Sequence, residues 1–135
     1  MEAQSLILAL NETRKTLLAS RLLLVRGPRA RDASLAPNIH PGDGVWLDGC
    51  ERIDTASMRA PLDLLFLDAD QRVVAVVANL HAGSAVPQVD GAVGILQLAP
   101  GTIRLSQTQK GDHIVVEPIA QRSVQEPAAT RASRG

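Results

Sequence analysis

The chain has 135 residues, and its 14 basic and 14 acidic side chains cancel to a formal net charge of zero. This length suits a single domain, and the chain lacks the positive surplus on which nucleic-acid binding usually depends. Trp46 and Phe66 are the only aromatic residues, so we expect an aliphatic interior and no aromatic platform for stacking bases.

The N-terminal part of the chain predicts a short apolar segment followed by a helix. Residues 5–10 form an apolar run that suits a buried strand or a lead-in segment. From residue 12 to about residue 25, apolar side chains recur at the spacing of one helix face, at Leu17, Leu18, Leu22 and Val25. Asn11 or Thr13 can cap this helix, and Gly27 and Pro28 end it. Residues 29–44 are rich in proline and glycine and predict a long surface loop.

The middle of the chain predicts β-strands. A strand begins at residues 45–47, and the clearest strands are residues 62–67 and 73–77, which are rich in branched and bulky side chains. The acidic turn at residues 68–71 joins these two strands into a predicted β-hairpin. Because both strands are almost entirely apolar, we expect the hairpin to be covered on both faces.

The C-terminal part predicts two further strands, at residues 93–98 and 114–116, with a loop at 80–91 before them. Thr102 can cap one or two helical turns between these strands. After Pro118 the pattern of apolar core residues ends, so we expect one domain over residues 1–119 and a disordered tail over residues 120–135.

The predicted fold is mainly β (a β-rich α+β domain). It is a compact antiparallel sandwich or barrel-like sheet with one N-terminal helix and a short helical turn near residues 102–108.

Charged side chains are segregated along the chain. Residues 14–31 contain six basic residues and no acid, whereas residues 43–70 contain seven acids and two arginines. Two interpretations stay open: a basic element facing an acidic one in the same fold, or a basic docking patch for an acidic partner.

The stretch before the central hairpin gathers most of the chemically versatile side chains. The candidate binding residues there are Trp46, Cys50, Asp54, Thr55, Met58, Arg59 and Asp63. A nucleophilic Cys50 would need a neighbouring base, but His40, His81 and His113 are each isolated in sequence, and a small Cys at a strand end is the plainer interpretation. Arg59 and Asp63 flank a proline bend and are expected to pair, with an anion contact at Arg59 as the alternative.

Motifs for metals and cofactors are missing from the sequence, which contains no HxxH, CxxC, EF-hand, GxxxxGK[ST], GxGxxG or GxSxG pattern. We therefore expect no cofactor and no metal. Asp68 and Asp70 are turn acids, a type that usually bonds its own backbone, although a cation site is the alternative.

A single Cys fits a reducing compartment, and we see no signal peptide and no apolar run long enough to span a membrane. A cytoplasmic, soluble protein is the resulting expectation.

Several pieces of the sequence occur in the order typical of one family. They are residues 20–22, residues 44–47 leading to Cys50, then Ile53, Thr55, Met58 and Arg59, residues 61–68, residues 73–74, residues 96–102 and residues 110–112. In this order they resemble the bacterial family called domain of unknown function 192. The resemblance implies a compact mainly-β fold and no established reaction. The chain departs from the family pattern at residues 23–27, at Gly49, where a proline is usual, at Asp54, where a histidine is common, and at Gln97, where an acid is common. If these polar positions form a shared site, that site is altered here.

Three functional hypotheses follow. The first is a non-catalytic binding or accessory module that docks a protein partner or a small ligand through residues 44–59 and the adjoining loop 80–91. The second is a scaffold component of a surface-appendage or secretion assembly. The third is an enzyme that uses Cys50 or the cluster of Asp54, Arg59 and Asp63. The absence of a catalytic pair in sequence favours the first.

Overall fold

The computed structural model describes residues 7–26, 32–34, 36–49 and 52–118, and for residues 32–34, 52–54 and 118 it describes the course of the backbone only. Almost all regular structure in these ranges is β. In chain order the strands are β1 (Ile7–Asn11), β2 (Thr16–Ala19), β3 (Arg21–Val25), β4 (Asp32–Ser34), β5 (Asp43–Asp48), β6 (Arg52–Asp54), β7 (Leu62–Leu67), β8 (Val73–Leu80), β9 (Gly94–Leu98) and β10 (Ile114–Pro118). The short helix α2 spans Thr102–Ser106.

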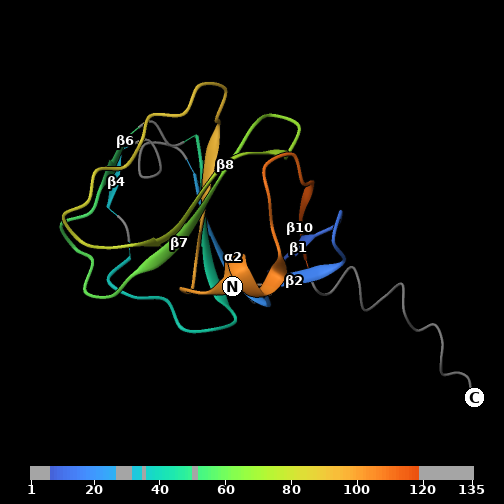
Figure 1. Cartoon of the computed structure of the whole chain (residues 1–135), viewed down its shortest axis with the longest axis horizontal. Helices are drawn as coiled ribbons and strands as arrows, with labels where there is room; N and C mark the ends of the chain where they lie inside the picture. Colours follow the sequence, from blue (N-terminus) through green and yellow to red (C-terminus); the bar gives the residue numbers. More distant parts are fainter. Residues whose placement is uncertain (1–6, 27–31, 35, 50–51, 119–135) are drawn as a thin grey trace, which may run out of the picture.

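The strands described here form three sheets. The largest has the strand order β3-β5-β9-β7-β8, the second has the order β10-β1-β2, and β4 pairs with β6. The pairings of β3 with β5 and of β4 with β6 are parallel, and the others are antiparallel. Figure 1 shows α2, β1, β2 and β10 toward one side of the five-stranded sheet and β4 and β6 toward the other. The predicted mainly-β fold is confirmed, as a sandwich rather than a closed barrel.

One face of the five-stranded sheet packs against the second sheet and α2, and we call it the sheet-packed face. Because side chains alternate along a strand, β7 and β9 direct every second residue to this side. The resulting core joins side chains of the five-stranded sheet to side chains of β1, β2, α2 and β10: Trp46, Leu65, Leu67, Leu96 and Leu98 on one side, and Ala9, Leu18, Ala19, Ile103 and Ile114 on the other. Two layers of regular structure therefore enclose this core.

The opposite face, which we call the loop-covered face, is closed by loops. The alternate residues of β7 and β9 point this way and pack with Ile39 and Met58, and with the partly buried side chains of Ala36, Val86 and Val89. We define the loop cover as residues 36–42, 55–60 and 81–93. The same sheet thus has one side closed by strands and a helix and another side closed largely by irregular chain.

The predicted N-terminal helix is wrong. The chain forms β2 and β3 instead, with a hairpin turn before β2 at Lys15 (φ 61°). In β3 Leu22 is buried and Leu23 exposed, whereas β2 leaves Leu17 exposed and buries both Leu18 and Ala19, beside a register shift in its pairing with β1. The buried Leu18 and Leu22 are four positions apart, so the two short strands together imitate a helical spacing. Hydrogen-bonded pairing of β2 with β1 and of β3 with β5 stabilises two strands here instead of the predicted helix.

The predicted hairpin of β7 and β8 is confirmed, but its coverage differs between the strands. All six residues of β7 are buried, whereas β8 lies at the edge of the sheet and leaves Val76 39% exposed. The expectation that both faces of the hairpin are covered therefore holds for β7 and is wrong for β8.

The helical turn near residues 102–108 is confirmed as α2, but Thr102 is not its cap. Gly101 occupies the N-cap position in a left-handed conformation (φ 92°), and no side chain caps the helix from there. The disordered tail expected at residues 120–135 lies outside the described residues.

Candidate functional site

Trp46 lies in the core between the sheets rather than at a surface. Its side chain crosses Gly94 on the neighbouring strand, where a Cβ atom would come within 2.2 Å of the indole. Only glycine fits beneath the ring, so the pair fixes the packing of β5 on β9. Trp46 thus has a packing role in the described structure.

Asp63 is 1% exposed and lies on the sheet-packed face. Its Oδ1 accepts the backbone N–H of Asn79 at 2.8 Å, and its Oδ2 accepts the backbone N–H of Ile103 at 2.8 Å. The carboxylate therefore ties the end of β8 to the first turn of α2, whose N–H groups have no partner within the helix. The expected pairing with Arg59 is wrong, because both oxygens of Asp63 are engaged by backbone amides.

Thr55, Met58 and Arg59 lie together in the loop cover. The Met58 N–H donates to the Thr55 carbonyl at 3.1 Å, and the Arg59 N–H donates to the Pro37 carbonyl at 2.7 Å. The Met58 side chain is buried against the loop-covered face. Of the remaining candidates, Cys50 lies outside the described residues, and the side chain of Asp54 is not described. The predicted residues whose side chains the structure describes thus divide between the two sides of the sheet and do not converge on one site.

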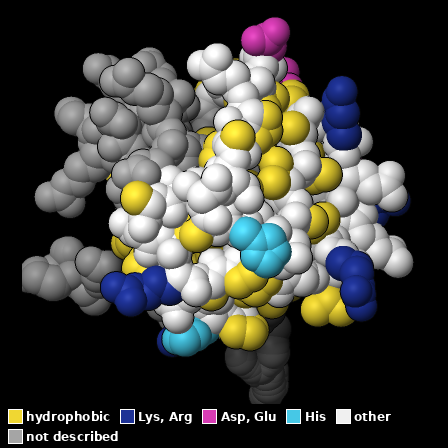
Figure 2. Space-filling model, turned by 60° about the vertical axis from the view of Figure 1, so that its left-hand side comes forward, with side chains coloured by type: hydrophobic (Ala, Val, Ile, Leu, Met, Phe, Trp, Pro, Cys, Tyr) yellow, Lys and Arg dark blue, Asp and Glu magenta, His cyan; other side chains and the backbone are white. Residues whose placement is uncertain are grey.

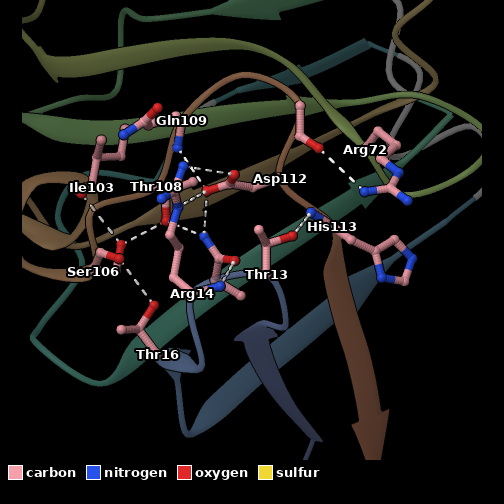
Figure 3. A network of polar contacts seen from close by, with 12 residues as sticks. Thr13, Arg14, Thr16, Arg72, Ile103, Ser106, Thr108, Gln109, Asp112 and His113 are labelled. Carbon is pink, nitrogen blue, oxygen red and sulfur yellow. Dashed lines mark hydrogen bonds and ion pairs between the residues drawn. The ribbon is translucent and has the colours of Figure 1, made fainter.

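A second set of polar residues, which the sequence did not single out, forms a network beside α2 (Figure 3). Its centre is Asn11, which is 0% exposed. The Asn11 Nδ2 donates to Thr108 Oγ1 and to Asp112 Oδ2, both at 2.9 Å, and its Oδ1 accepts the Arg14 N–H at 3.0 Å. Every polar atom of this carboxamide is therefore hydrogen bonded.

Asp112 completes this network. The Arg14 guanidinium donates to both of its oxygens, at 3.0 and 3.3 Å, and the Gln109 N–H donates to Oδ2 at 2.9 Å. Burial acts to raise the pKa of Asp112, but the hydrogen bonds from Arg14, Asn11 and Gln109 outweigh it and hold this pKa below its ordinary value. The group is an ionised structural anchor rather than an acid with a free proton.

The same network reaches β2 and the end of α2. Ser106 Oγ and Thr108 Oγ1 lie 2.7 Å apart, and the Thr16 hydroxyl donates to the Ser106 carbonyl at 3.0 Å. Nearby, His113 contacts Glu12 at 2.8 Å, and this hydrogen bond lowers the pKa of the Glu12 carboxyl. These contacts join chain segments about 100 residues apart, so their evident role is to fix α2 and β10 on the N-terminal hairpin.

The segregated charges meet between β3 and β5. Arg21 contacts Asp43 at 2.9 Å and Arg26 contacts Asp48 at 3.5 Å. A basic strand therefore faces an acidic one in the same fold, as one of the two interpretations predicted. Asp68 also behaves as expected of a turn acid, because its Oδ1 accepts the N–H groups of Asp70 and Arg72 at 2.9 Å each.

Gln97 is a polar side chain on the loop-covered face of the sheet, and it contacts the loop cover. It is 1% exposed, and its Oε1 accepts the Ala36 N–H at 2.9 Å. On β9 it lies in register with Val45 on β5 and Leu64 on β7, within an otherwise apolar face. The sequence offered a weak signal here, namely a polar residue inside an apolar strand.

The described residues contain no group of three His, Cys, Asp or Glu side chains placed to hold a metal ion. Within the same part of the chain, no helix has the length and apolar character needed to cross a membrane.

Two solved structures share this fold. One, called a putative transcription regulator, comes from Sinorhizobium meliloti; it is 18% identical, with a TM-score of 0.60 over 86% of this chain and 98% of the other. The second is a protein of unknown function from Novosphingobium aromaticivorans, also 18% identical, with a TM-score of 0.62 over 81% of this chain and 82% of the other. At this identity the likeness shows the fold alone.

No curated protein matches the chain. The model of the family domain of unknown function 192, described as Uncharacterized ACR, matches residues 27–116. This range contains most of the ordered motifs on which the resemblance depends, including the strands β5, β7 and β9 and the turn at Asp112. The chain belongs to the domain of unknown function 192 family.

Proposed function

We propose that this chain is a non-catalytic binding or accessory module and that the loop cover is its contact surface. The observation that carries the proposal is the distribution of side chains on that side of the molecule. In Figure 2 hydrophobic side chains gather near the middle of the face, and the charged side chains lie toward its edges. An apolar centre with a polar rim is typical of protein and ligand contact surfaces.

The architecture supports the same proposal. Three separate segments of the chain, 36–42, 55–60 and 81–93, meet over one face of a rigid sheet. Loops held by a rigid scaffold commonly carry recognition, because they vary without disturbing the core. The buried carboxylates on the other side of the sheet serve the fold, because both oxygens of Asp63 accept backbone N–H groups and both oxygens of Asp112 accept from Arg14.

The test compares three tagged forms of the protein as baits in extract of its own cells. Ala85→Arg places a bulky charge on the exposed surface of the loop cover, and Ala69→Arg makes the same change at the exposed tip of the β7–β8 hairpin. We expect a species that the wild type and A69R retain and A85R loses, with all three proteins melting at similar temperatures. Retention of nothing by the wild type, or equal retention by A85R, would overturn the proposal.

A further inference from the structure

The sequence contains three aspartates that are directly followed by a glycine, at residues 43–44, 48–49 and 90–91. In such a pair the backbone nitrogen of the glycine can attack the aspartate side chain, because glycine has no Cβ atom to hinder the approach. The attack requires the backbone on both sides of the glycine nitrogen to rotate, which a strand held in a sheet allows only after local opening. The fold therefore decides which of the three pairs reacts.

The first two pairs are held by the five-stranded sheet. Gly44 is buried inside β5, where it pairs with both β3 and β9. A Cβ atom at Gly44 would come within 3.0 Å of Leu22 and 3.1 Å of the Gln97 carbonyl, so this backbone has no room to turn. Gly49 follows the last residue of β5, and its N–H donates to the Val93 carbonyl at 2.7 Å. Both glycine nitrogens are thus fixed away from the preceding carboxyl group.

The third pair lies in the loop cover. Asp90 and Gly91 are exposed and form the centre of a turn, which the Ala92 N–H closes by donating to the Val89 carbonyl at 3.2 Å. The amide between the two central residues of such a turn takes no part in the closing hydrogen bond. Gly91 has a φ of 84°, and a Cβ atom there would meet no atom of the described residues within 4 Å. The reacting groups therefore have open space around them.

We infer that Asp90–Gly91 is a site of spontaneous modification, at which aspartate rearranges to isoaspartate. The Gly91 nitrogen forms a bond to Cγ of Asp90, and the hydroxyl of this carboxyl group leaves as water with the proton of the N–H group. The resulting succinimide ring then takes up water. Cleavage of the new bond restores aspartate, whereas cleavage of the original peptide bond gives isoaspartate. The water that was lost is regained, so the reaction needs no other reactant.

The modification changes the loop cover. In isoaspartate the main chain runs through Cβ and is one atom longer, and the former backbone carboxyl group becomes the side chain. The turn at Asp90 separates Val89 and Ala92, which pack against the loop-covered face. Lengthening the chain between them alters this packing and the hydrogen bond that closes the turn. Any effect on partner capture rests on the proposed function, whereas the chemistry at Asp90 does not.

The experiment follows the folded full-length chain during long incubation in water labelled with heavy oxygen. Each passage through the succinimide adds one heavy oxygen to the aspartate, and peptide mass spectrometry after digestion in ordinary water locates it. We expect Asp90 to take up label about tenfold faster than Asp43 or Asp48, because the sheet must open before these two react. The Asp90 peptide should also yield a second chromatographic form of equal sequence, which is isoaspartate. Asp90→Glu, whose longer side chain disfavours ring closure, should lose the label at this position only.

Two comparisons separate the fold from the local sequence. In guanidinium chloride the unfolded chain should label the three pairs at similar rates. Asp90→Asn and Asp43→Asn both offer ammonia as a better leaving group, and in the folded chain only the first should convert rapidly to aspartate and isoaspartate. Equal labelling of the three pairs in the folded chain, or label at Asp90 only after unfolding, would overturn the inference. Both results would leave the A85R capture experiment, and with it the proposed function, unaffected.

Discussion

The two faces of the five-stranded sheet are closed in different ways. On the sheet-packed face, Asp63, Asn11 and Asp112 hold α2 and β10 through hydrogen bonds that use each of their polar side-chain atoms. On the loop-covered face, apolar contacts, a few backbone bonds and the hydrogen bond that Gln97 accepts from Ala36 hold the cover. The difference indicates that networks of buried polar residues fix the sheet-packed face, whereas mainly apolar contacts close the loop-covered face.

A large effect is expected at Asp63. Asp63→Asn replaces one acceptor of a backbone N–H by an NH2 group, which leaves a buried donor facing a donor. We expect the free energy of unfolding in urea to fall by about 3 kcal/mol. The matched change Asp90→Asn, at an exposed acid of the loop cover, should alter it by less than about 0.5 kcal/mol. Equal effects of the two changes would refute a clamping role for Asp63.

The two buried carboxamides allow a direct comparison by near-isosteric replacement. Asn11→Leu removes three hydrogen bonds and strands the donors and acceptors of Arg14, Thr108 and Asp112, so we expect a loss of about 3 kcal/mol. Gln97→Met removes the single hydrogen bond that Gln97 accepts from the Ala36 N–H, so we expect a smaller loss of about 1 kcal/mol. Chemical denaturation measures both, and a loss for Gln97→Met as large as that for Asn11→Leu would contradict the difference between the two faces.

A smaller effect is expected from pH. The pKa of Asp112 lies below its ordinary value in the folded chain, so the unfolded chain binds its proton first as the solution is acidified. The stability that Asp112 contributes is therefore present above its unfolded pKa, about 4, and is lost as the pH falls through its folded pKa. Wild-type protein should lose more stability between about pH 6 and pH 3 than Asp112→Asn does, and identical pH profiles would contradict this.

Sequence patterns predicted the strands whose apolar character is continuous, because a fully buried strand such as β7 needs no partner to be recognised. They failed at β2 and β3, where two short strands joined at Ser20 place buried leucines at the spacing of a helix face. The outcome there depends on pairing with β1 and β5, which local spacing does not encode.

The candidate site was predicted less well than the fold. Met58 and Arg59 lie in the loop cover, but Trp46 and Asp63 lie on the other side of the sheet. Proximity in sequence misleads in a β-sheet, because successive residues point to opposite faces. Asn11 was interpreted as a helix cap and Asp112 only as part of a family motif, since their partners lie about 100 positions away and only the folded chain brings them together.

Native-state hydrogen exchange tests the central contrast between the two faces most directly. We predict that the amides of Ala36 and Arg59, which hold the loop cover, exchange through local openings that need less free energy than global unfolding. The amides of Asn79, Ile103 and Gln109, which are held by Asp63 and Asp112, should exchange only through global unfolding. Equal protection of both sets would contradict the account, because the cover would then be as firmly fixed as the sheet-packed face.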